Sequence, residues 1–205
     1  SSTGLKGKVK MSVLNMMERM TPYVIAGEKM PVDKMGLADH LCWQLNQLDP
    51  AADAARHQIM SELFGTVHSD TFIKGGFHCD YGFNIHFQGY AWVNYNCSIL
   101  DTSPVTIGAG AFIAPQVVFA CSAHPLLATQ RVDEGLMTSA PITLADNVWI
   151  GAGSVIMGSV TIGTGSIIGA GSVVNKDIPA GVVAMGSPCK VYRKVTEADR
   201  INLKK

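Results

Sequence analysis

The group in this chain best suited to acid–base chemistry is the histidine of the stretch S-A-H-P at residues 122–125. An imidazole changes its charge near neutral pH, so His124 could accept a proton from a hydroxyl group as a general base. The other histidines are His40, His57, His68, His78 and His86. An isolated surface histidine usually has no catalytic role, so the case for His124 depends on the elements that position it.

The cysteines offer no comparable chemistry. They are Cys42, Cys79, Cys97, Cys121 and Cys189, and no two of them form a C-x-x-C pair. Their odd number and wide spacing argue against a disulfide framework and against structural zinc, so we expect small buried apolar residues. Cys121 lies close to His124, but no serine or cysteine has the partnered base that a covalent acyl-enzyme needs.

The composition excludes several classes of protein. The 205 residues carry 16 basic and 16 acidic side chains, so no net charge draws the chain to nucleic acid or to a membrane surface. No apolar run approaches the ~20 residues of a membrane helix, and no signal-peptide pattern is present. These features favour a cytoplasmic protein. Residues 1–10 precede the first methionine and are expected to be a leader or an expression remnant.

Residues 150–174 repeat with a period of six. They read IGAGSVIMGSVTIGTGSIIGAGSVV, with an aliphatic residue at every sixth position. A strand has a period of two and a helix one of about 3.6, so neither element explains the spacing. A chain that runs straight, turns a corner and repeats does explain it, because three such sides close a triangular coil. The sequence therefore predicts a mainly β protein, with a parallel β-helix over residues 71–190.

The repeat extends upstream of this stretch. Its inward positions are Leu144, Ile150, Ile156, Ile162, Ile168 and Val174, preceded by Ile107, Ile113 and Phe119 and by Phe87, Val93 and Ile99. Small residues follow four positions after most of them, as tight corners require. Gly151, Gly163 and Gly169 directly follow inward aliphatics, where we expect the backbone to bend sharply.

The repeat is interrupted twice. Two extra residues intrude around residues 101–104, and the register is lost for longer across residues 121–141. A long loop in an otherwise regular solenoid usually carries function. Because His124 lies in this loop, the interruption strengthens its candidacy.

The flanks of the repeat are predicted to be helical. We expect residues 11–70 to form a helical cap over one end of the coil and residues 191–205 to form a C-terminal segment with a short helix. The cap helices are indicated by the stripe Leu37, Leu41, Leu45 and Leu48 and, less strongly, by Met16, Met17 and Met20. Asp49 is expected to cap a further helix that begins at Pro50 and whose buried face is Ala55, Ile59, Leu63 and Phe64. Thr196 begins a T-E-A-D pattern typical of a capping box.

Longer motifs now point to a family. The stretches CDYGFNIHF, WVNYNCSILD, IAPQVVF, SAHP, APITLADNVWIGAGSVI and GSPCKV occur in this order between residues 79 and 191. Together they resemble the galactoside/maltose O-acetyltransferase branch of the hexapeptide-repeat acyltransferases, which includes nodulation-type enzymes. The resemblance implies a left-handed β-helix and an acetyl-CoA-dependent transfer of an acetyl group to a hydroxyl of a sugar or similar small alcohol.

The resemblance also assigns roles on the acceptor side. His124 matches the catalytic general base, and Asn94 matches the asparagine that binds the acceptor and stabilises the transition state. Asp80, Asp101 and Met137 fall at acceptor-contact positions. For Asp80 and Asp101 the alternative is structural, namely capping of the corners by their carboxylates.

On the coenzyme side the resemblance implies a second group of residues. They are Trp149, Ala152, Ala170, Asn175, Lys176, Lys190 and Arg193. For Trp149 the alternative is plain packing between coils. Asn175 replaces the family's threonine, and Lys190 replaces an arginine, which keeps the charge but loses the bidentate fork. No metal is implied.

Some family features are missing, and they leave the acceptor open. The N-terminal region that supplies charged acceptor contacts aligns poorly, with Ala26 and Met35 where charges are expected, and Thr102 replaces an acidic residue. The family also implies a homotrimer with active sites between subunits. The alternatives are a xenobiotic or antibiotic O-acetyltransferase of the same fold, a zinc γ-carbonic-anhydrase-like protein, and a non-catalytic scaffold.

Overall fold

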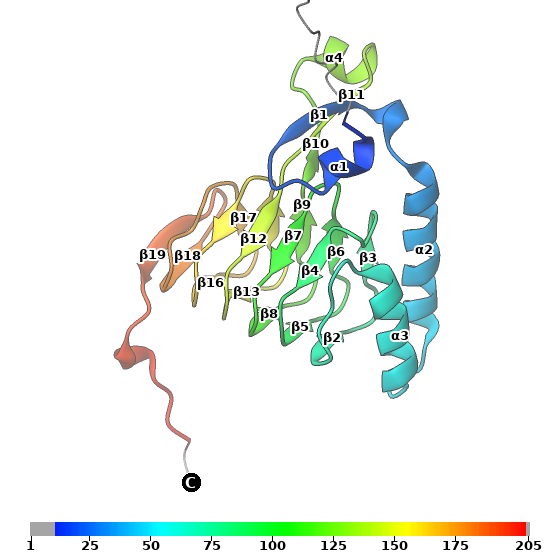
Figure 1. The fold of residues 1–205 in the computed structure, drawn as a ribbon. Coiled ribbons are helices and arrows are strands. Elements are labelled where there is room, and N and C mark those ends of the chain that lie inside the picture. Colours follow the sequence, from blue (N-terminus) through cyan, green and yellow to red (C-terminus); the bar gives the residue numbers. More distant parts are fainter. Residues whose placement is uncertain (1–10, 204–205) are drawn as a thin grey trace, which may run out of the picture.

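The molecule is a three-sided parallel β-helix, shown by a computed structural model that describes residues 11–203 (Figure 1). The leader expected at residues 1–10 lies outside this range. The first face contains β4 (Ile85–Phe87), β7 (Val105–Ile107), β12 (Ile142–Leu144) and β15 (Thr161–Ile162). The second face contains β2 (Thr71–Ile73), β5 (Ala91–Val93), β8 (Ala111–Ile113), β13 (Trp149–Ile150), β16 (Ile167–Ile168), β18 (Val182–Met185) and the antiparallel β19 (Lys190–Lys194). The third face contains β3 (His78–Cys79), β6 (Ser98–Leu100), β9 (Val118–Ala120), β14 (Val155–Met157) and β17 (Val173–Val174).

The core is the stripe of inward residues that the period of six predicts. Ile113, Ile150 and Ile168 pair in register on three successive coils, and each is almost completely buried. Every other inward position named above is buried to the same degree. Each such side chain contributes about 1.5–3 kcal/mol. The predicted parallel β-helix and its core are therefore confirmed.

Glycine is required after the inward residues for a different reason from the one expected. A Cβ on Gly151 would lie 2.5 Å from the backbone nitrogen of Ala170 and 2.7 Å from the carbonyl oxygen of Ile168, both on the next coil. The sharp bend comes two residues later, at Gly153, where φ is +68°. Gly151 is thus required by the close approach of two coils rather than by its own backbone angle.

Replacing Gly151 by alanine should lower the free energy of unfolding by about 1–3 kcal/mol, because two backbone segments must separate to admit the methyl group. Denaturant titration measures this change. Gly36→Ala is the matched control, since Gly36 is exposed in a helix and nothing lies within 4 Å of its added Cβ. An equal loss in both variants would contradict the proposed contact.

The helical cap forms, with shifted boundaries. It contains α1 (Val13–Met17), α2 (Val32–Gln47) and α3 (Asp53–Leu63). The prediction that the third of these begins at Pro50 is wrong, because the Asp49 carboxylate accepts the Ala51 N–H and holds a turn ahead of Asp53. Of the predicted face, Leu63 and Phe64 are buried and Ile59 is partly buried, but Ala55 is exposed and Arg56 is buried instead.

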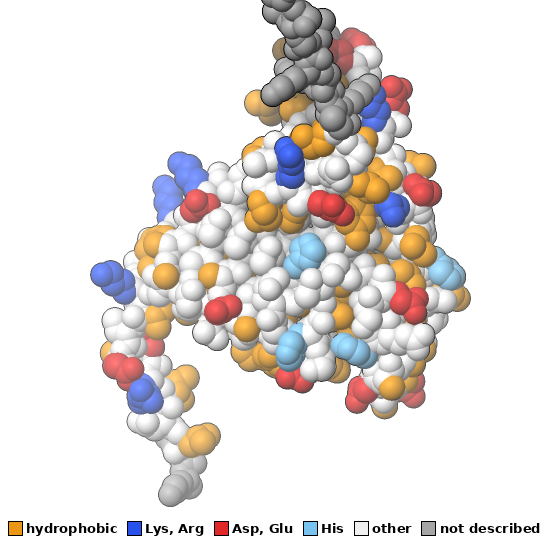
Figure 2. All heavy atoms as spheres, in the orientation of Figure 1, with side chains coloured by type: hydrophobic (Ala, Val, Ile, Leu, Met, Phe, Trp, Pro, Cys, Tyr) orange, Lys and Arg blue, Asp and Glu red, His pale blue; other side chains and the backbone are white. Residues whose placement is uncertain are grey.

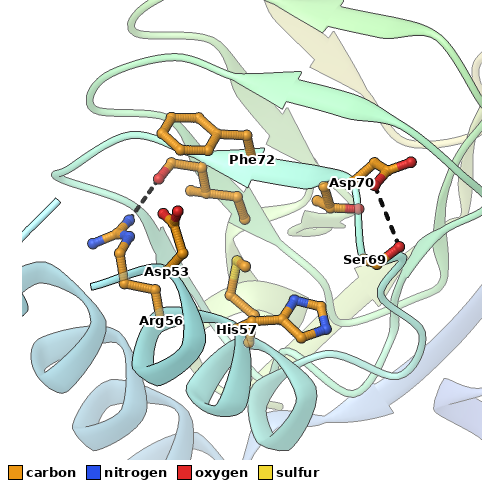
Figure 3. Close-up of a pocket in the computed structure, with 9 residues that line it drawn as sticks. Asp53, Arg56, His57, Ser69, Asp70 and Phe72 are labelled. Carbon is orange, nitrogen blue, oxygen red and sulfur yellow. Dashed lines mark hydrogen bonds between the residues drawn. The ribbon is translucent and has the colours of Figure 1, made fainter. Parts of the chain in front are cut away.

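Arg56 fastens the cap to the first coil. Its guanidinium donates to the carbonyl oxygens of Leu45 in α2, at 3.1 Å, and of Ile73 in β2, at 2.6 Å. Figure 3 shows Arg56 beside a pocket of about 270 Å³ that Asp53, His57 and Asp70 also line. The charge of Arg56 is used to join α2, α3 and β2. Its role in this pocket is therefore structural.

The long loop is more ordered than the sequence indicates. It contains β10 (Ser122–Ala123), α4 (Ala128–Val132) and β11 (Leu136–Ser139). Both strands belong to a three-stranded antiparallel sheet with β1 (Tyr23–Ala26), which is followed by a short 3-10 turn at Gly27–Lys29. We call this sheet the strap. In Figure 1 the strap and α4 stand above the coils, and α2 and α3 lie beside the first coils.

The C-terminal segment contains less helix than predicted. The capping box at Thr196 is present, but it opens only a 3-10 turn at Glu197–Asp199. Ahead of it, β19 runs antiparallel to β18 and closes the second face. No helix within residues 11–203 is long and apolar enough to cross a membrane.

Candidate active site

The strap positions His124. Ser122 and Ala123 of β10 pair with Ser139 and Thr138 of β11, and His124 follows directly. The imidazole is exposed. Beyond it, the Arg131 guanidinium donates to the carbonyl oxygens of Pro125, at 2.9 Å, and of Leu126, at 3.3 Å. The turn that carries His124 is therefore held on both sides.

A buried polar network fixes the strap to the coils. The Tyr23 hydroxyl donates to the Thr102 carbonyl at 2.5 Å, and the Ser139 hydroxyl lies 2.6 Å from the hydroxyls of both Thr102 and Ser103. Burial raises the pKa of Tyr23, so its hydroxyl stays a donor. The insertion near residues 101–104 thus presents a backbone carbonyl that anchors β1 and two hydroxyls that anchor β11.

A groove of about 420 Å³ lies beside the strap. Val24, Ala123 and Thr138 occupy equivalent positions on the three strands and line one wall. Ala120 and Met157, on the third face, also line the groove. The walls are mainly small and apolar, so the groove next to His124 has room for part of a bound molecule.

Asn94 lies on a different part of the surface. It follows β5 at the corner between the second and third faces, which we call the Asn94 corner. Its Oδ1 accepts the Tyr95 N–H at 2.9 Å, which fixes the side-chain amide at the corner. Beside it is a pocket of about 440 Å³, lined with aromatic rings that include Trp92, Phe112 and Trp149.

The aromatic rings form a ladder across the second face. Trp92, Phe112 and Trp149 are register partners on β5, β8 and β13, and they point away from the core. Trp149 is 53% exposed, so part of its ring packs between coils and part is free to contact a ligand. At the next coil, Phe72 stacks on Trp92 with 4.6 Å between ring centroids, and the Lys74 ammonium lies over both rings.

His124 leaves the coils at another corner. The loop joins β9 on the third face to β12 on the first, and we call this the His124 corner. The groove beside the strap and the aromatic pocket share no lining residue. One chain therefore does not bring His124 and Asn94 together.

Asp80 and Asp101 belong to the His124 corner, one coil apart. Burial raises the pKa of the half-buried Asp80 to about 6, and the charge of Asp39 adds to the effect. Asp101 is 0% exposed, and its two oxygens accept the N–H groups of Tyr81, at 2.8 Å, and Asn84, at 3.3 Å. The expectation that Asp101 faces the acceptor is therefore corrected: its carboxylate caps the corner.

The burial of Asp101 makes stability depend on pH. Burial raises its pKa from 3.8 to about 7, so the folded state holds this proton more tightly than the unfolded state. The resulting stabilisation is full below about pH 4 and is lost as the pH rises to about 7, a change of a few kcal/mol. Denaturant titrations should show this fall in wild type relative to Asp101→Asn. Parallel pH profiles for the two proteins would assign the effect to another group.

The remaining acceptor candidate points inward. Met137 on β11 pairs with Ile25 and packs against a second apolar cluster that includes Met17, Tyr23 and Tyr81. It is partly buried, on the same face of the strap as the Tyr23 side chain. The Met137 side chain thus points from the strap toward this apolar cluster, near the base of the His124 turn.

The expected coenzyme residues are divided between the two corners. Ala152 and Ala170 are exposed at the Asn94 corner on successive coils, linked by a bond from the Gly171 N–H to the Ala152 carbonyl. Asn175 and Lys176 are exposed after β17, at the His124 corner. All four residues are exposed, so a ligand at either corner can reach them.

The two remaining expected coenzyme residues lie on β19. Lys190 and Arg193 are exposed, and the Arg193 guanidinium forms a two-pronged ion pair with Asp199, with N–O distances of 2.7 and 2.8 Å. Figure 2 shows Lys and Arg side chains at this end of the solenoid, over β18 and β19. Across residues 11–203, no three His, Cys, Asp or Glu side chains are placed to hold a metal ion.

Sequence reasoning missed the strap. Tyr23, Thr102 and Ser139 come from three distant segments, and no local pattern connects them. The one available signal is the β-branched pair Val24-Ile25, which favours a strand within a region we expected to be helical.

Comparison with known proteins relates the chain to transferases. The family described as bacterial transferase hexapeptide (six repeats) matches residues 141–176. The galactoside O-acetyltransferase of Escherichia coli K12 is 41% identical over 160 residues, 78% of this chain and 78% of that protein. A structure of galactoside acetyltransferase in complex with coenzyme A matches with a TM-score of 0.80 and 38% identity, covering 85% of this chain and 86% of the other. A hexapeptide-repeat acetyltransferase of Vibrio cholerae, solved with acetyl coenzyme A, matches with a TM-score of 0.83 and 31% identity, covering 91% of this chain and 100% of the other.

Proposed function

Since this chain belongs to the hexapeptide-repeat acetyltransferases, we propose that it moves an acetyl group from acetyl-CoA to a hydroxyl of a sugar or similar small alcohol. Acetyl-CoA supplies the activated acetyl group as a thioester. The observation that carries the proposal is the placement of an exposed imidazole and a fixed amide at two corners that neighbouring chains can bring together.

In the proposed reaction His124 is the general base. Its imidazole takes the proton of the acceptor hydroxyl as that oxygen attacks the thioester carbon. The Asn94 side-chain N–H donates to the oxygen of the carbonyl as negative charge develops there. The imidazolium then returns the proton to the departing sulfur. Holding the hydroxyl and the thioester together makes the step effectively unimolecular.

Direct transfer is favoured over a covalent acyl-enzyme. The thiol nearest His124 in the sequence is Cys121, which is buried and donates to the Ser103 carbonyl at 3.5 Å. Burial raises the pKa of Cys121 to about 12, so the thiol stays protonated and is a poor nucleophile. This supports a complex in which both substrates are bound at once.

We place the site between subunits of a homotrimer. In this arrangement the His124 corner of one chain faces the Asn94 corner of the next, which completes the site. The tip of the loop supports such a contact, because Leu126 is 99% exposed and Leu127 and Val132 are exposed beside it. Apolar side chains at the end of a projecting loop are typical of a subunit interface.

Complementation between two inactive variants tests this arrangement. Chains carrying His124→Ala and chains carrying Asn94→Ala, co-expressed in equal amounts, should recover about a quarter of the wild-type activity, because a randomly assembled interface has about one chance in four of pairing two intact corners. Acetyl transfer is measured by release of free coenzyme A thiol. A site built within one chain would give no recovery.

For the coenzyme we propose a path along the Asn94 corner. Ala152 and Ala170 are small enough to admit a pantetheine arm against the backbone, and Trp149 would lie near the thioester. Asn175 and Lys176 of the neighbouring chain would contact the coenzyme from the other side. Lys190 and Arg193 would attract the phosphates by charge, with Lys190 as a point charge rather than a fork.

For the acceptor we propose a sugar or a related alcohol. Asp80, raised in pKa and half-buried, accepts hydrogen bonds from hydroxyl groups at the His124 corner when ionised. The aromatic ladder offers flat apolar surfaces, which suit one face of a sugar ring and equally a less polar drug-like alcohol. An acceptor panel of mono- and disaccharides, nucleosides and hydroxylated drugs, scored by thiol release, separates these classes. Turnover with none of them would contradict the proposed function.

A further inference from the structure

Two of the five cysteines lie next to each other in the fold. The sulfurs of Cys42 in α2 and Cys79 in β3 are 3.6 Å apart, and the residues are only 1% and 6% exposed. Two other thiols contact backbone carbonyls instead: Cys97 points to Ala114 at 3.2 Å and Cys121 to Ser103 at 3.5 Å. The pair joins the helical cap to the first coil.

The approach of the two sulfurs is enforced by Asn46. Asn46 lies one helical turn after Cys42, and its side-chain N–H donates to the Phe77 carbonyl at 2.9 Å. Its Oδ1 accepts the N–H groups of Gly76, at 2.9 Å, and Phe77, at 3.2 Å. Since i and i+4 share a helix face and Cys79 follows Phe77 by two residues, the same clamp holds both thiols toward each other.

The environment makes the two thiols unequal. Donation from the Cys79 S–H lowers the pKa of Cys42, and the same contact together with burial raises the pKa of Cys79. The thiolate therefore forms more readily on Cys42, and Cys79 is placed to react second.

We propose that Cys42 and Cys79 form an oxidation site, at which hydrogen peroxide converts the two thiols to a reversible disulfide between α2 and β3. The Cys42 thiolate attacks one peroxide oxygen, the O–O bond breaks, and the sulfur becomes a sulfenic acid as hydroxide leaves. Cys79 sulfur then loses its proton and attacks the Cys42 sulfur, so that an S–S bond forms and the S–O bond breaks. In total, two thiols are oxidised, one peroxide is reduced, and two water molecules form.

The disulfide acts on the acceptor side of the site. Cys79 directly precedes Asp80, and closing the bond shortens the sulfur–sulfur distance from 3.6 Å to about 2.05 Å. The two sulfurs must approach each other by more than an ångström, and the bond then ties the cap covalently to the end of β3. This consequence rests on the proposed function, because it takes Asp80 as an acceptor contact.

Peptide mapping of the intact, purified protein tests the cross-link without using activity. After treatment with hydrogen peroxide, a single cross-linked peptide pair containing Cys42 and Cys79 should appear, and dithiothreitol should remove it. Cys97→Ser should retain the cross-link, and both Cys42→Ser and Cys79→Ser should lose it. If wild-type protein keeps five free thiols after peroxide treatment, or forms sulfinic acids in place of the disulfide, the proposal is overturned.

Kinetics of the same samples test the coupling. Oxidation should lower kcat/KM for the acceptor by about tenfold or more and leave KM for acetyl-CoA unchanged, and Cys42→Ser should be insensitive. Unaltered acceptor kinetics in the fully cross-linked protein would refute the coupling. Failure of the reduced protein to transfer acetyl to any acceptor would refute the proposed function instead, whatever the mapping shows.

Discussion

Replacing His124 by alanine should reduce acetyl transfer by about 10²-fold or more while coenzyme binding and the free energy of unfolding stay close to wild type. The imidazole is exposed and the turn around it is held by Arg131 and by the strap, so its loss removes the base without loosening the fold. Thiol-release kinetics give the turnover, and calorimetric titration with coenzyme A gives the affinity.

His40→Ala is a suitable control for this variant. His40 is also exposed, but it lies on α2 in the cap, far along the chain from the loop. Its removal should leave turnover unchanged. Near-normal turnover in His124→Ala would remove the general base from the mechanism and would leave the family membership intact.

Replacing Asn94 by alanine should lower kcat by about 10²–10³-fold and change the affinity for coenzyme A much less, because the amide is assigned to the charge that develops only in the transition state. Asn94 also accepts the Tyr95 N–H, so the alanine variant changes the corner as well as the donor. Turnover and coenzyme affinity are measured as for His124.

The Asn94→Asp variant separates these two roles. A carboxylate can still accept the Tyr95 N–H, but it has no N–H to donate to a developing oxyanion. We expect it to be as inactive as Asn94→Ala with the corner preserved. A loss of coenzyme affinity that exceeds the loss of kcat would place Asn94 on the coenzyme side instead.

The solenoid was predictable because its information is local and periodic. Ile150 and Ile168 occupy the same inward position on successive coils, and the spacing of six residues makes this position visible in the sequence. The resemblance to the galactoside acetyltransferase branch is likewise confirmed by the similarity to named members over most of the chain. The trimer, the acceptor and the roles of individual site residues stay predictions.

What the sequence does not reveal depends on long-range contacts. Tyr23 pairs with Ser139, which is far away in the sequence, and no local pattern around either residue predicts the pairing. The same is true of Arg56, whose charge pattern suggests a surface helix until its partners Leu45 and Ile73 are known. From its residue type Asp101 could be a ligand contact, but in the fold its carboxylate is buried and accepts a backbone N–H.

The strap separates two kinds of change that natural variation can make in this enzyme. Residues around α4 can be replaced without disturbing the strand pairs that hold the turn at His124, except for Arg131, whose guanidinium also holds that turn. A single deletion inside β11 is different in kind: it would exchange the directions of Met137 and Thr138 and bring the wrong side chains to the polar anchor. Sequence changes that alter the substrate range of such chains are therefore expected at the tip of the loop, whereas the lengths of β10 and β11 are expected to stay fixed.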